Sequence, residues 1–200
     1  MSTTLLTPRL RLRPLSASDT PQIVALHTDP AVLRYLGRPV DIDTVRREHL
    51  PRLLRVDPHS GRPDYLAAET RDDARVVGWF MLRRVDEESL LRAGPDEGAL
   101  ELGYRLERAA WGRGYATEGG RALVEDAFTT LGADRVVATT MAVNTASRRV
   151  LEKCGLRLVR TFFPAWDDPL DGAEHGDVAY ALSRHEWART GAGCAHHPTA

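Results

Sequence analysis

The segment 99–131 constrains the fold of this chain more than any other. It opens with the strand-like run ALELGYRL, turns through ERAAWGRG and continues as YATEGGRALVEDAFTTL, whose apolar residues recur at helical spacing. Gly112 and Gly114 at the corner carry no Cβ, so the backbone can turn sharply and approach a ligand closely. The first amides of the helix and its positive dipole end would face this corner. The segment therefore predicts a strand–turn–helix unit that suits a phosphate or diphosphate, although a simple glycine hinge has the same spacing.

The glycine corner does not match two common nucleotide-binding motifs. A dinucleotide-binding unit needs G-x-G-x-x-G, and Thr117 stands where its third glycine would be. The next β-like run ends in Thr139, Thr140 and Met141, without the acidic residue that would hold a ribose. No Lys-Ser or Lys-Thr pair follows the corner, as a P-loop would require. These residues argue against an NAD-dependent oxidoreductase and against a P-loop NTPase.

Alternating and β-branched runs on both sides of this segment predict further strands of one sheet. We expect strands at 9–15, 64–70, 76–85, 99–106, 135–141, 156–163 and 178–182. We also expect a helix at 43–56 that Pro51 kinks or splits in two, a helix from Asn144 to Cys154, and several short helical turns. Gly78, in the second arm of a β-hairpin, predicts a bulge. The order of elements predicts an α/β fold with helices on both faces of a mixed sheet.

The composition is that of a globular chain without an obvious macromolecular target. The net charge of −1 gives no basic excess for nucleic acid, and no apolar run approaches the length of a membrane span. Cys154 and Cys194 suggest no disulfide framework, so we expect a cytoplasmic protein. His196 and His197 have no carboxylate or cysteine at a useful helical spacing. We therefore expect no metal, no nucleic-acid partner and no membrane partner.

Three segments together resemble the GNAT superfamily of N-acetyltransferases, and in particular its Rim-type branch, the ribosomal-protein N-terminal alanine/serine acetyltransferases. TPRLRLR, which begins at Thr7, is similar to the start of that branch, and GYATE, which begins at Gly114, is similar to its corner. The third segment has Asn144 and Ser147 in the pattern N-x-x-S, followed by EKCGL where the branch has E-K-x-G-F. The resemblance covers roughly residues 7–187. One departure is Trp111, which stands where the superfamily usually has Gln or Arg before its glycines.

The resemblance implies a GNAT fold, with a mixed and mostly antiparallel sheet of six to seven strands that splays at its centre. It implies a single acetyltransferase domain over residues 1–189 and a disordered tail over 190–200. It also implies acetyl-CoA as co-substrate, whose pantetheine would pair with the backbone of Tyr104, Arg105 and Leu106. The side chain of Asn144 would bind the pantetheine as well, or act only as a helix N-cap. The backbone amides that would hold the diphosphate belong to Gly112, Arg113, Gly114, Tyr115, Ala116 and Thr117.

By the same resemblance, a primary amine would attack the thioester directly and form a tetrahedral oxyanion. Glu101 would act as the general base through water, unless it is a salt-bridged strand residue. Glu118 is the alternative base, although a carboxylate in the first turn of a helix also stabilises the helix dipole. Ser147 would donate a hydrogen bond or a proton to the departing thiolate, or would only bond the helix backbone. The acceptor would be a protein N-terminus or a small amine, such as an aminoglycoside or an amino-acid derivative.

A different class of protein stays open at this point, namely a non-catalytic acyl-CoA-binding or regulatory module that keeps the groove and has lost turnover. The presence of Glu101 and Ser147 argues against it. The resemblance also leaves room for a homodimer. The acidic stretches 86–97 and 167–177 would either attract a cationic acceptor or form solvated loops.

Overall fold

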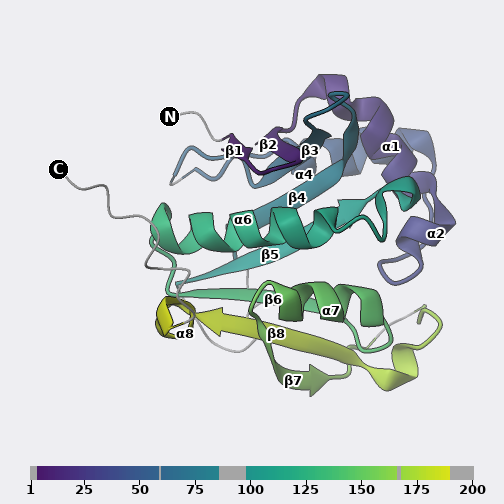
Figure 1. Cartoon of the computed structure of the whole chain (residues 1–200). Coiled ribbons are helices and arrows are strands. Elements are labelled where there is room, and N and C mark those ends of the chain that lie inside the picture. Colours follow the sequence, from purple (N-terminus) through teal and green to yellow (C-terminus); the bar gives the residue numbers. More distant parts are fainter. Residues whose placement is uncertain (1–3, 59, 86–97, 166–167, 190–200) are drawn as a thin grey trace.

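The structure, a computed structural model, describes residues 4–58, 60–85, 98–165 and 168–189 (Figure 1). In these residues one sheet of eight strands has the order β1-β2-β3-β4-β5-β6-β8-β7. Every neighbouring pair is antiparallel except β5 and β6, which are parallel. The strands are β1 (Leu5–Leu6), β2 (Leu10–Pro14), β3 (Tyr65–Thr70), β4 (Val76–Arg84), β5 (Ala99–Leu106), β6 (Arg135–Met141), β7 (Arg157–Phe162) and β8 (Asp177–Ser183). The predicted mixed sheet is confirmed, with more strands than the expected six to seven because the short β1 pairs with β2.

Helices cover both faces of this sheet (Figure 1). One face carries α6 (Tyr115–Thr129) and α7 (Thr145–Lys153), and the other carries α1 (Thr20–Thr28), the π-helical turn η2 (Val45–His49) and α4 (Leu50–Leu53). The other helical elements are α2 (Pro30–Leu33), α3 (Ile42–Thr44), α8 (Arg184–Arg189) and the 3-10 turns η1 (Ala17–Asp19), η3 (Arg108–Ala110) and η4 (Ala173–His175). The acidic stretch 86–97 and the predicted tail 190–200 lie outside the described residues.

The helix expected over 43–56 is divided, which is one of the two outcomes predicted from Pro51, and it ends before Val56. The chain forms α3, η2 and α4 in turn, and α4 ends at Leu53. Pro51 explains the break, because it has no N–H to donate and its ring would clash with the carbonyl of Arg47 in a regular α-helix. The wider turn η2, in which the Leu50 N–H bonds to the Val45 carbonyl, gives the proline the room it needs.

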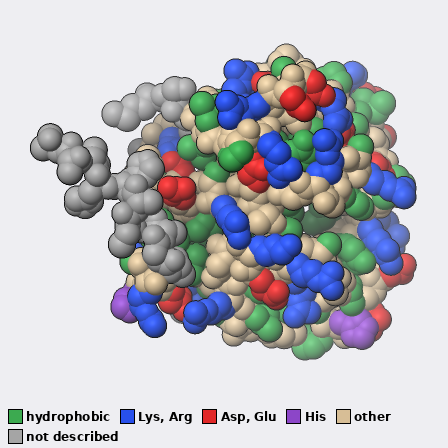
Figure 2. Space-filling view, in the orientation of Figure 1, with side chains coloured by type: hydrophobic (Ala, Val, Ile, Leu, Met, Phe, Trp, Pro, Cys, Tyr) green, Lys and Arg blue, Asp and Glu red, His purple; other side chains and the backbone are tan. Residues whose placement is uncertain are grey.

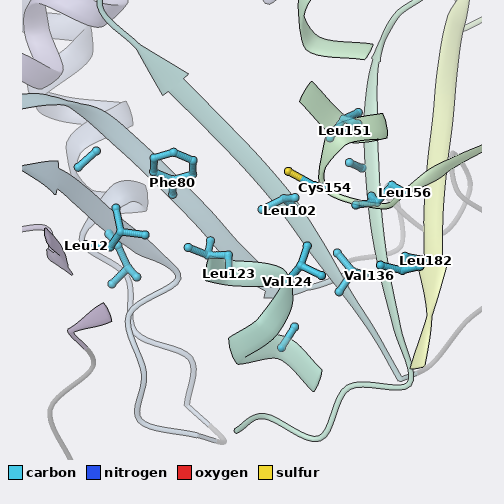
Figure 3. Packing of buried hydrophobic residues seen from close by; sticks show 14 of the residues in the cluster. Leu12, Phe80, Leu102, Leu123, Val124, Val136, Leu151, Cys154, Leu156 and Leu182 are labelled. Atoms are coloured by element: carbon cyan, nitrogen blue, oxygen red, sulfur yellow. The ribbon is translucent and has the colours of Figure 1, made fainter. Parts of the chain in front are cut away.

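Alternate residues of the central strands face two different apolar clusters. Leu102 of β5 packs with Leu123 of α6 and Leu151 of α7, as Figure 3 shows. Trp79 and Met81 of β4 belong to the cluster on the other face, with α1, η2 and α4. Because side chains alternate along a strand, the even-numbered residues of β5 face α6 and α7, and the odd-numbered residues face α1 and η2.

The sheet opens between its two parallel strands. The pairing of β5 with β6 joins Ala99 to Arg135, Leu100 to Val136 and Glu101 to Val137, and it goes no further. β5 nevertheless continues to Leu106 and β6 to Met141. The last five residues of β5 therefore present a backbone edge that β6 does not cover. This is the central splay that the resemblance to the GNAT superfamily implies.

The bulge predicted at Gly78 is confirmed. Ala68 pairs with Gly78 and Glu69 with Val76, so Val77 is an extra residue in β4. Gly78 has φ +153°, and a Cβ at this position would collide with the backbone carbonyl of Arg105 on β5. Glycine is therefore required here for β4 to approach β5 beside the splay.

A second close approach joins α6 to the sheet and gives a test of the packing. A Cβ on Gly119 would overlap the ring of Phe80, which is completely buried. We expect Gly119→Ala to lower the free energy of unfolding by about 1–3 kcal/mol, because overpacking outweighs the gain of about 1 kcal/mol in helix propensity. Urea denaturation measures the change.

A matched double variant serves as the control for this packing prediction. Phe80→Leu replaces the ring with a shorter side chain. Gly119→Ala should therefore lower the free energy of unfolding less in a Phe80→Leu background than in the natural chain. Greater stability of the single variant Gly119→Ala would mean that α6 and β4 do not pack this tightly.

Candidate active site

The glycine corner lies between β5 and α6. Gly112 (φ +70°) and Gly114 (φ +82°) both adopt the left-handed conformation, and Gly114 is the N-cap of α6. Among the described residues, no backbone hydrogen bond uses the amides from Gly112 to Thr117. The corner therefore presents a row of open N–H donors at the positive end of a 15-residue helix. Such a row can bind a diphosphate.

An ion pair from the start of the chain holds this corner in place. Glu118 accepts hydrogen bonds from the Thr7 hydroxyl, the Arg9 backbone N–H and the Arg9 Nε, each at 2.7 Å. Arg9 Nη1 also donates to the Arg113 carbonyl at 2.8 Å, and the guanidinium lies 4.8 Å from the centre of the Tyr115 ring. Burial would raise the pKa of Glu118, but the bonds from Thr7 and Arg9 outweigh it and lower the pKa. Glu118 therefore ties the segment just before β2 to α6, and its oxygens are occupied by these structural bonds.

The lowered pKa of Glu118 predicts a pH-dependent loss of stability. We expect Glu118→Gln to lower the free energy of unfolding at neutral pH by about 1–2 kcal/mol, since bonds to a charged group are lost. A carboxylate with a lowered folded pKa stabilises the protein above its unfolded pKa of about 4.3, and this contribution disappears as the pH falls through the folded value. Thermal unfolding from neutral to acid pH should therefore show the two proteins converge.

Glu125→Gln is the matched control for this comparison. Glu125 is exposed on the same helix, and its neutralisation should change the stability little at any pH. A difference in melting temperature between Glu118→Gln and the natural chain that stays constant as the pH falls would contradict the role of the ionised Glu118.

Two hydroxyl groups meet across the splay on the face of α6 and α7. The Tyr104 hydroxyl of β5 lies 3.0 Å from the Ser147 hydroxyl of α7. Burial raises the pKa of Tyr104 to about 12, against a smaller opposing effect of its bond with Ser147, so the phenol stays protonated. The family resemblance implies a role only for the backbone of Tyr104, because the neighbours of a strand residue along the chain do not indicate a side-chain partner 43 residues away.

Asn144 is the N-cap of α7, as one of the two predictions for it stated. Its side-chain oxygen accepts from the Ser147 N–H at 3.2 Å, and its Nδ2 donates to the Thr140 hydroxyl at 3.2 Å. These bonds fix the start of α7 at the far wall of the splay and hold Ser147 toward Tyr104. An amide nitrogen has two hydrogens, so Nδ2 keeps one donor for a ligand.

Glu101 lies on the opposite face of the sheet, where the two strands part. It is the last residue of β5 that pairs with β6, and its carboxylate accepts from Arg83 Nη2 at 2.7 Å and from Arg83 Nε at 3.1 Å. The side chain is 14% exposed. The splay thus has the corner, Tyr104 and Ser147 on one face and Glu101 on the other, at the point where the pairing of β5 with β6 ends.

Arg105 is a second charged residue on the Glu101 face, and sequence analysis assigned a role only to its backbone. Its guanidinium lies 5.3 Å from the centre of the Trp79 ring. Burial lowers the pKa of Arg105 to about 10. Burial, followed by the charge of Arg105, lowers the pKa of His27 to about 4 and also lowers that of His49. The sequence GYRL gives no sign that this arginine is enclosed.

Trp111 and Cys154 have structural roles. The indole N–H of Trp111 donates to the Leu106 carbonyl at 2.8 Å, so the residue that departs from the usual motif anchors the corner to the end of β5. Burial raises the pKa of Cys154 to about 12, which agrees with its predicted place in the core.

Among the described residues no group of three His, Cys, Asp or Glu side chains could hold a metal ion, and His196 and His197 lie outside them. No helix in the described ranges has the length and apolar character needed to cross a membrane.

Comparisons with known proteins decide the family. A model of the acetyltransferase (GNAT) domain matches residues 9–157. The chain is also similar to the FsC-acetyl coenzyme A-N(2)-transacetylase of Aspergillus fumigatus, with 35% identity over 188 residues, which cover 93% of this chain and 78% of the relative. The chain belongs to the GNAT family of acetyltransferases. Its predicted membership of the superfamily is confirmed.

Solved structures agree with the fold of this GNAT acetyltransferase. A GNAT-family acetyltransferase from Bacillus anthracis superposes with a TM-score of 0.71 at 19% identity, over 92% of this chain and all of that one. The aminoglycoside acetyltransferase AAC(6')-Ib, solved in complex with coenzyme A, superposes with a TM-score of 0.67 at 18% identity, over 90% of this chain and 97% of that one. At these identities the likeness is one of fold.

Like other GNAT acetyltransferases, the protein uses acetyl-CoA as its acetyl donor. Its structure fits this ligand in two respects: the corner offers open amides for a diphosphate, and the uncovered edge of β5 offers backbone groups for an extended amide chain. Basic side chains also lie over α6 and α7 on the face shown in Figure 2, where Arg121, Arg149 and Lys153 are exposed. Their charge favours a polyanionic ligand on this face.

Proposed function

We propose that this acetyltransferase moves the acetyl group of acetyl-CoA to a primary amine, which attacks the thioester carbonyl directly. The observation that carries this proposal is the splay between β5 and β6, with open amides at one end and Glu101 beside the opening on the other face. In this arrangement the donor enters from the α6 face and the acceptor from the α1 face. Both would then meet at the opening without a covalent enzyme intermediate.

The backbone is proposed to hold acetyl-CoA, which supplies the acetyl group as a thioester. The uncovered edge of β5 at Tyr104, Arg105 and Leu106 would bond to the pantetheine as an added strand does. The remaining Nδ2 hydrogen of Asn144 would donate to the same arm. The amides that would hold the diphosphate are those of Gly112, Arg113, Gly114, Tyr115, Ala116 and Thr117.

Two proton transfers are assigned to side chains on opposite faces of the sheet. Glu101 would accept a proton from the acceptor amine through water, and its bonds with Arg83 would keep the carboxylate oriented. Ser147 would donate to the departing thiolate. The neutral Tyr104 phenol, 3.0 Å from Ser147, would pass a proton to Ser147 and then be reprotonated from water, which supports Ser147 as the donor.

The acceptor is proposed to be a primary amine of a small molecule or of a protein N-terminus. The motifs that begin at Thr7, Gly114 and Asn144 favour a Rim-type enzyme and thus a protein N-terminus. The name of the relative from Aspergillus fumigatus, an N(2)-transacetylase, favours a small amine at a position numbered 2. A panel that contains both kinds of amine decides between them.

Three further assignments complete this proposal. The catalytic unit is one domain over residues 1–189, followed by a tail over 190–200. The enzyme acts in the cytoplasm, in keeping with the free thiol of Cys154. It forms a homodimer, for which β7 offers an edge strand with the half-exposed Leu158 and Val159. Sedimentation of the full chain measures the last of these.

The test of the proposed function is release of free coenzyme A from acetyl-CoA in the presence of a mixed amine panel, with products identified by a mass increase of one acetyl group. We expect release to depend on the amine and to match acetylated product. Tight binding of acetyl-CoA without release across the panel would contradict the proposal and favour the non-catalytic binding module.

A further inference from the structure

A group of side chains on the α1 face forms what we call the Arg105 cluster, made up of Arg105, Trp79, His27 and His49. Trp79 and Arg105 are directly opposed on β4 and β5. His27 of α1 and His49 of η2 lie against each other above this face, with their ring centres 4.7 Å apart and their ring planes tilted by 47°. The cluster lies on the same side of the sheet as Glu101, where the acceptor is proposed to bind.

The hydrogen-bonding groups of this cluster are incomplete in the free protein. Arg105 Nε, Arg105 Nη1 and Trp79 Nε1 are buried and have no hydrogen-bond partner among the described residues. All three are N–H donors, so the groups they lack are acceptor oxygens. Buried donors of this kind are rare in folded proteins and each calls for a physical explanation.

The charge of the cluster is also unbalanced. The ring of Trp79 offsets part of the cost of burying the Arg105 cation, but it carries no negative charge. His27 cannot supply one, and its Nδ1–H already donates to the Ile23 carbonyl. Glu101, the carboxylate nearest along β5, is bonded to Arg83. A buried cation without a counter-charge is costly, and a bound anion removes that cost.

We propose that Arg105 binds a carboxylate of the acceptor, so that the substrate is a primary amine that also carries a carboxylate. This rests on the proposed function, since it names the class of amine. The flat guanidinium matches a carboxylate with two parallel N–H···O bonds. Arg105 keeps partial exposure, which lets such a group reach it. Glu101 and Arg105 are four residues apart on one strand, about 13 Å between their Cα atoms, so the amine and the carboxylate would lie between their side chains.

The proposal distinguishes an amino-acid-like acceptor from the N-terminus of a protein. In a protein the carbonyl next to the first amine is an amide and carries no charge. Arg105 would then bond only to a neutral carbonyl oxygen, and its positive charge would remain unpaired. The cluster therefore favours a small acceptor with a free carboxylate.

The experiment compares matched amines with and without a carboxylate. The pairs are glycine and glycinamide, L-lysine and L-lysinamide, and 6-aminohexanoate and hexylamine. We expect the carboxylate member of the best pair to have a kcat/KM higher by about 10- to 100-fold, since bonds to charged groups have this strength. In Arg105→Met this ratio should fall close to one, and Arg105→Lys should recover part of it.

Arg52→Met is the matched control, because Arg52 is an exposed arginine of α4 whose charge also reaches His49. It removes the same charge from the same region and should leave the ratio as it is in the natural chain. The proposal would be overturned if the natural chain had equal kcat/KM for both members of each pair, or if the ratio of the two kcat/KM values were unchanged in Arg105→Met. Either result would leave acetyl transfer itself intact.

A measurement without turnover separates this proposal from the proposed function. Glycine and 6-aminohexanoate should raise the melting temperature of the natural chain and not that of Arg105→Met, and glycinamide and hexylamine should raise neither. If no amine in any panel is acetylated, the proposed function fails, and this binding result alone decides the role of Arg105. Equal increases in the melting temperatures of the natural chain and Arg105→Met would overturn the proposed role of Arg105.

Discussion

Gly114→Val is expected to lower the affinity for coenzyme A by about 100-fold or more, because two effects add. The residue sits at φ +82°, which a β-branched side chain adopts only at a cost of roughly 1–3 kcal/mol. The added side chain would also project at the corner, where a Cβ would lie 3.2 Å from Arg9 Nη2, and would block the close approach of a diphosphate to the amides. Strain at this position lowers the affinity only because its relief would move the amides of the corner, and a 100-fold loss corresponds to about 2.8 kcal/mol. Calorimetric titration with coenzyme A measures it.

Gly132→Val is the matched control for the corner. Gly132 has φ +69°, close to that of Gly114, and a Cβ there would meet nothing within 4 Å. It lies beyond the other end of α6, so the variant carries the same kind of backbone strain without touching the corner. We expect it to lose stability and to keep its affinity for coenzyme A. Unchanged affinity in Gly114→Val would remove the corner from the diphosphate site.

Glu101→Gln is expected to lower the rate of acetyl transfer by about 100-fold at neutral pH and by much less at pH 9. A general base typically contributes at least about this factor. Deprotonation at pH 7 costs about 1.4 kcal/mol for an α-amine with a pKa near 8 and about 4.6 kcal/mol for a lysine-like amine with a pKa near 10.4. At pH 9 most of an α-amine is already neutral, so the base is needed less. The measurement is kcat/KM for one acceptor across this range.

Glu118→Gln separates the two carboxylates that sequence analysis considered as bases. Its expected effect is on stability, because Glu118 bonds to Thr7 and Arg9. Below the melting temperature, its rate relative to the natural chain should therefore not change between pH 7 and pH 9. An equal loss at both pH values in Glu101→Gln would exclude Glu101 as the base, and a pH-dependent loss in Glu118→Gln would return that role to Glu118.

Much of the fold follows from short stretches of the sequence. The two glycines around Arg113 and the helical period that starts at Tyr115 predict the corner and α6, and the structure confirms both. The strand at 135–141 and the N-cap at Asn144 are also confirmed. In each case the decisive factor is backbone conformation or side-chain period over a few residues, which neighbours along the chain control.

The sequence is less informative where two local preferences compete. Leu50, Leu53 and Leu54 have helical spacing, and Pro51 stands among them. The spacing and the proline together predict a helix that is either kinked or split in two, and the folded chain forms a π-helical turn and a separate short helix. The result depends on how Val45 and Leu53 can both be buried against the sheet, and this is a property of the packed structure.

The sequence by itself determined the order of strands and helices, the glycine corner and the family, because these depend on local conformation and on strings of adjacent residues. Only the tertiary structure decided what individual charged side chains do. Glu118 is bonded to residues more than 100 positions away, Tyr104 meets Ser147 across the splay, and two nitrogens of Arg105 are buried without a hydrogen-bond partner among the described residues. The reason is physical, because the partners and the dielectric surroundings of a side chain depend on the residues that pack against it in space. The separation of two residues along the chain does not reveal whether they pack together.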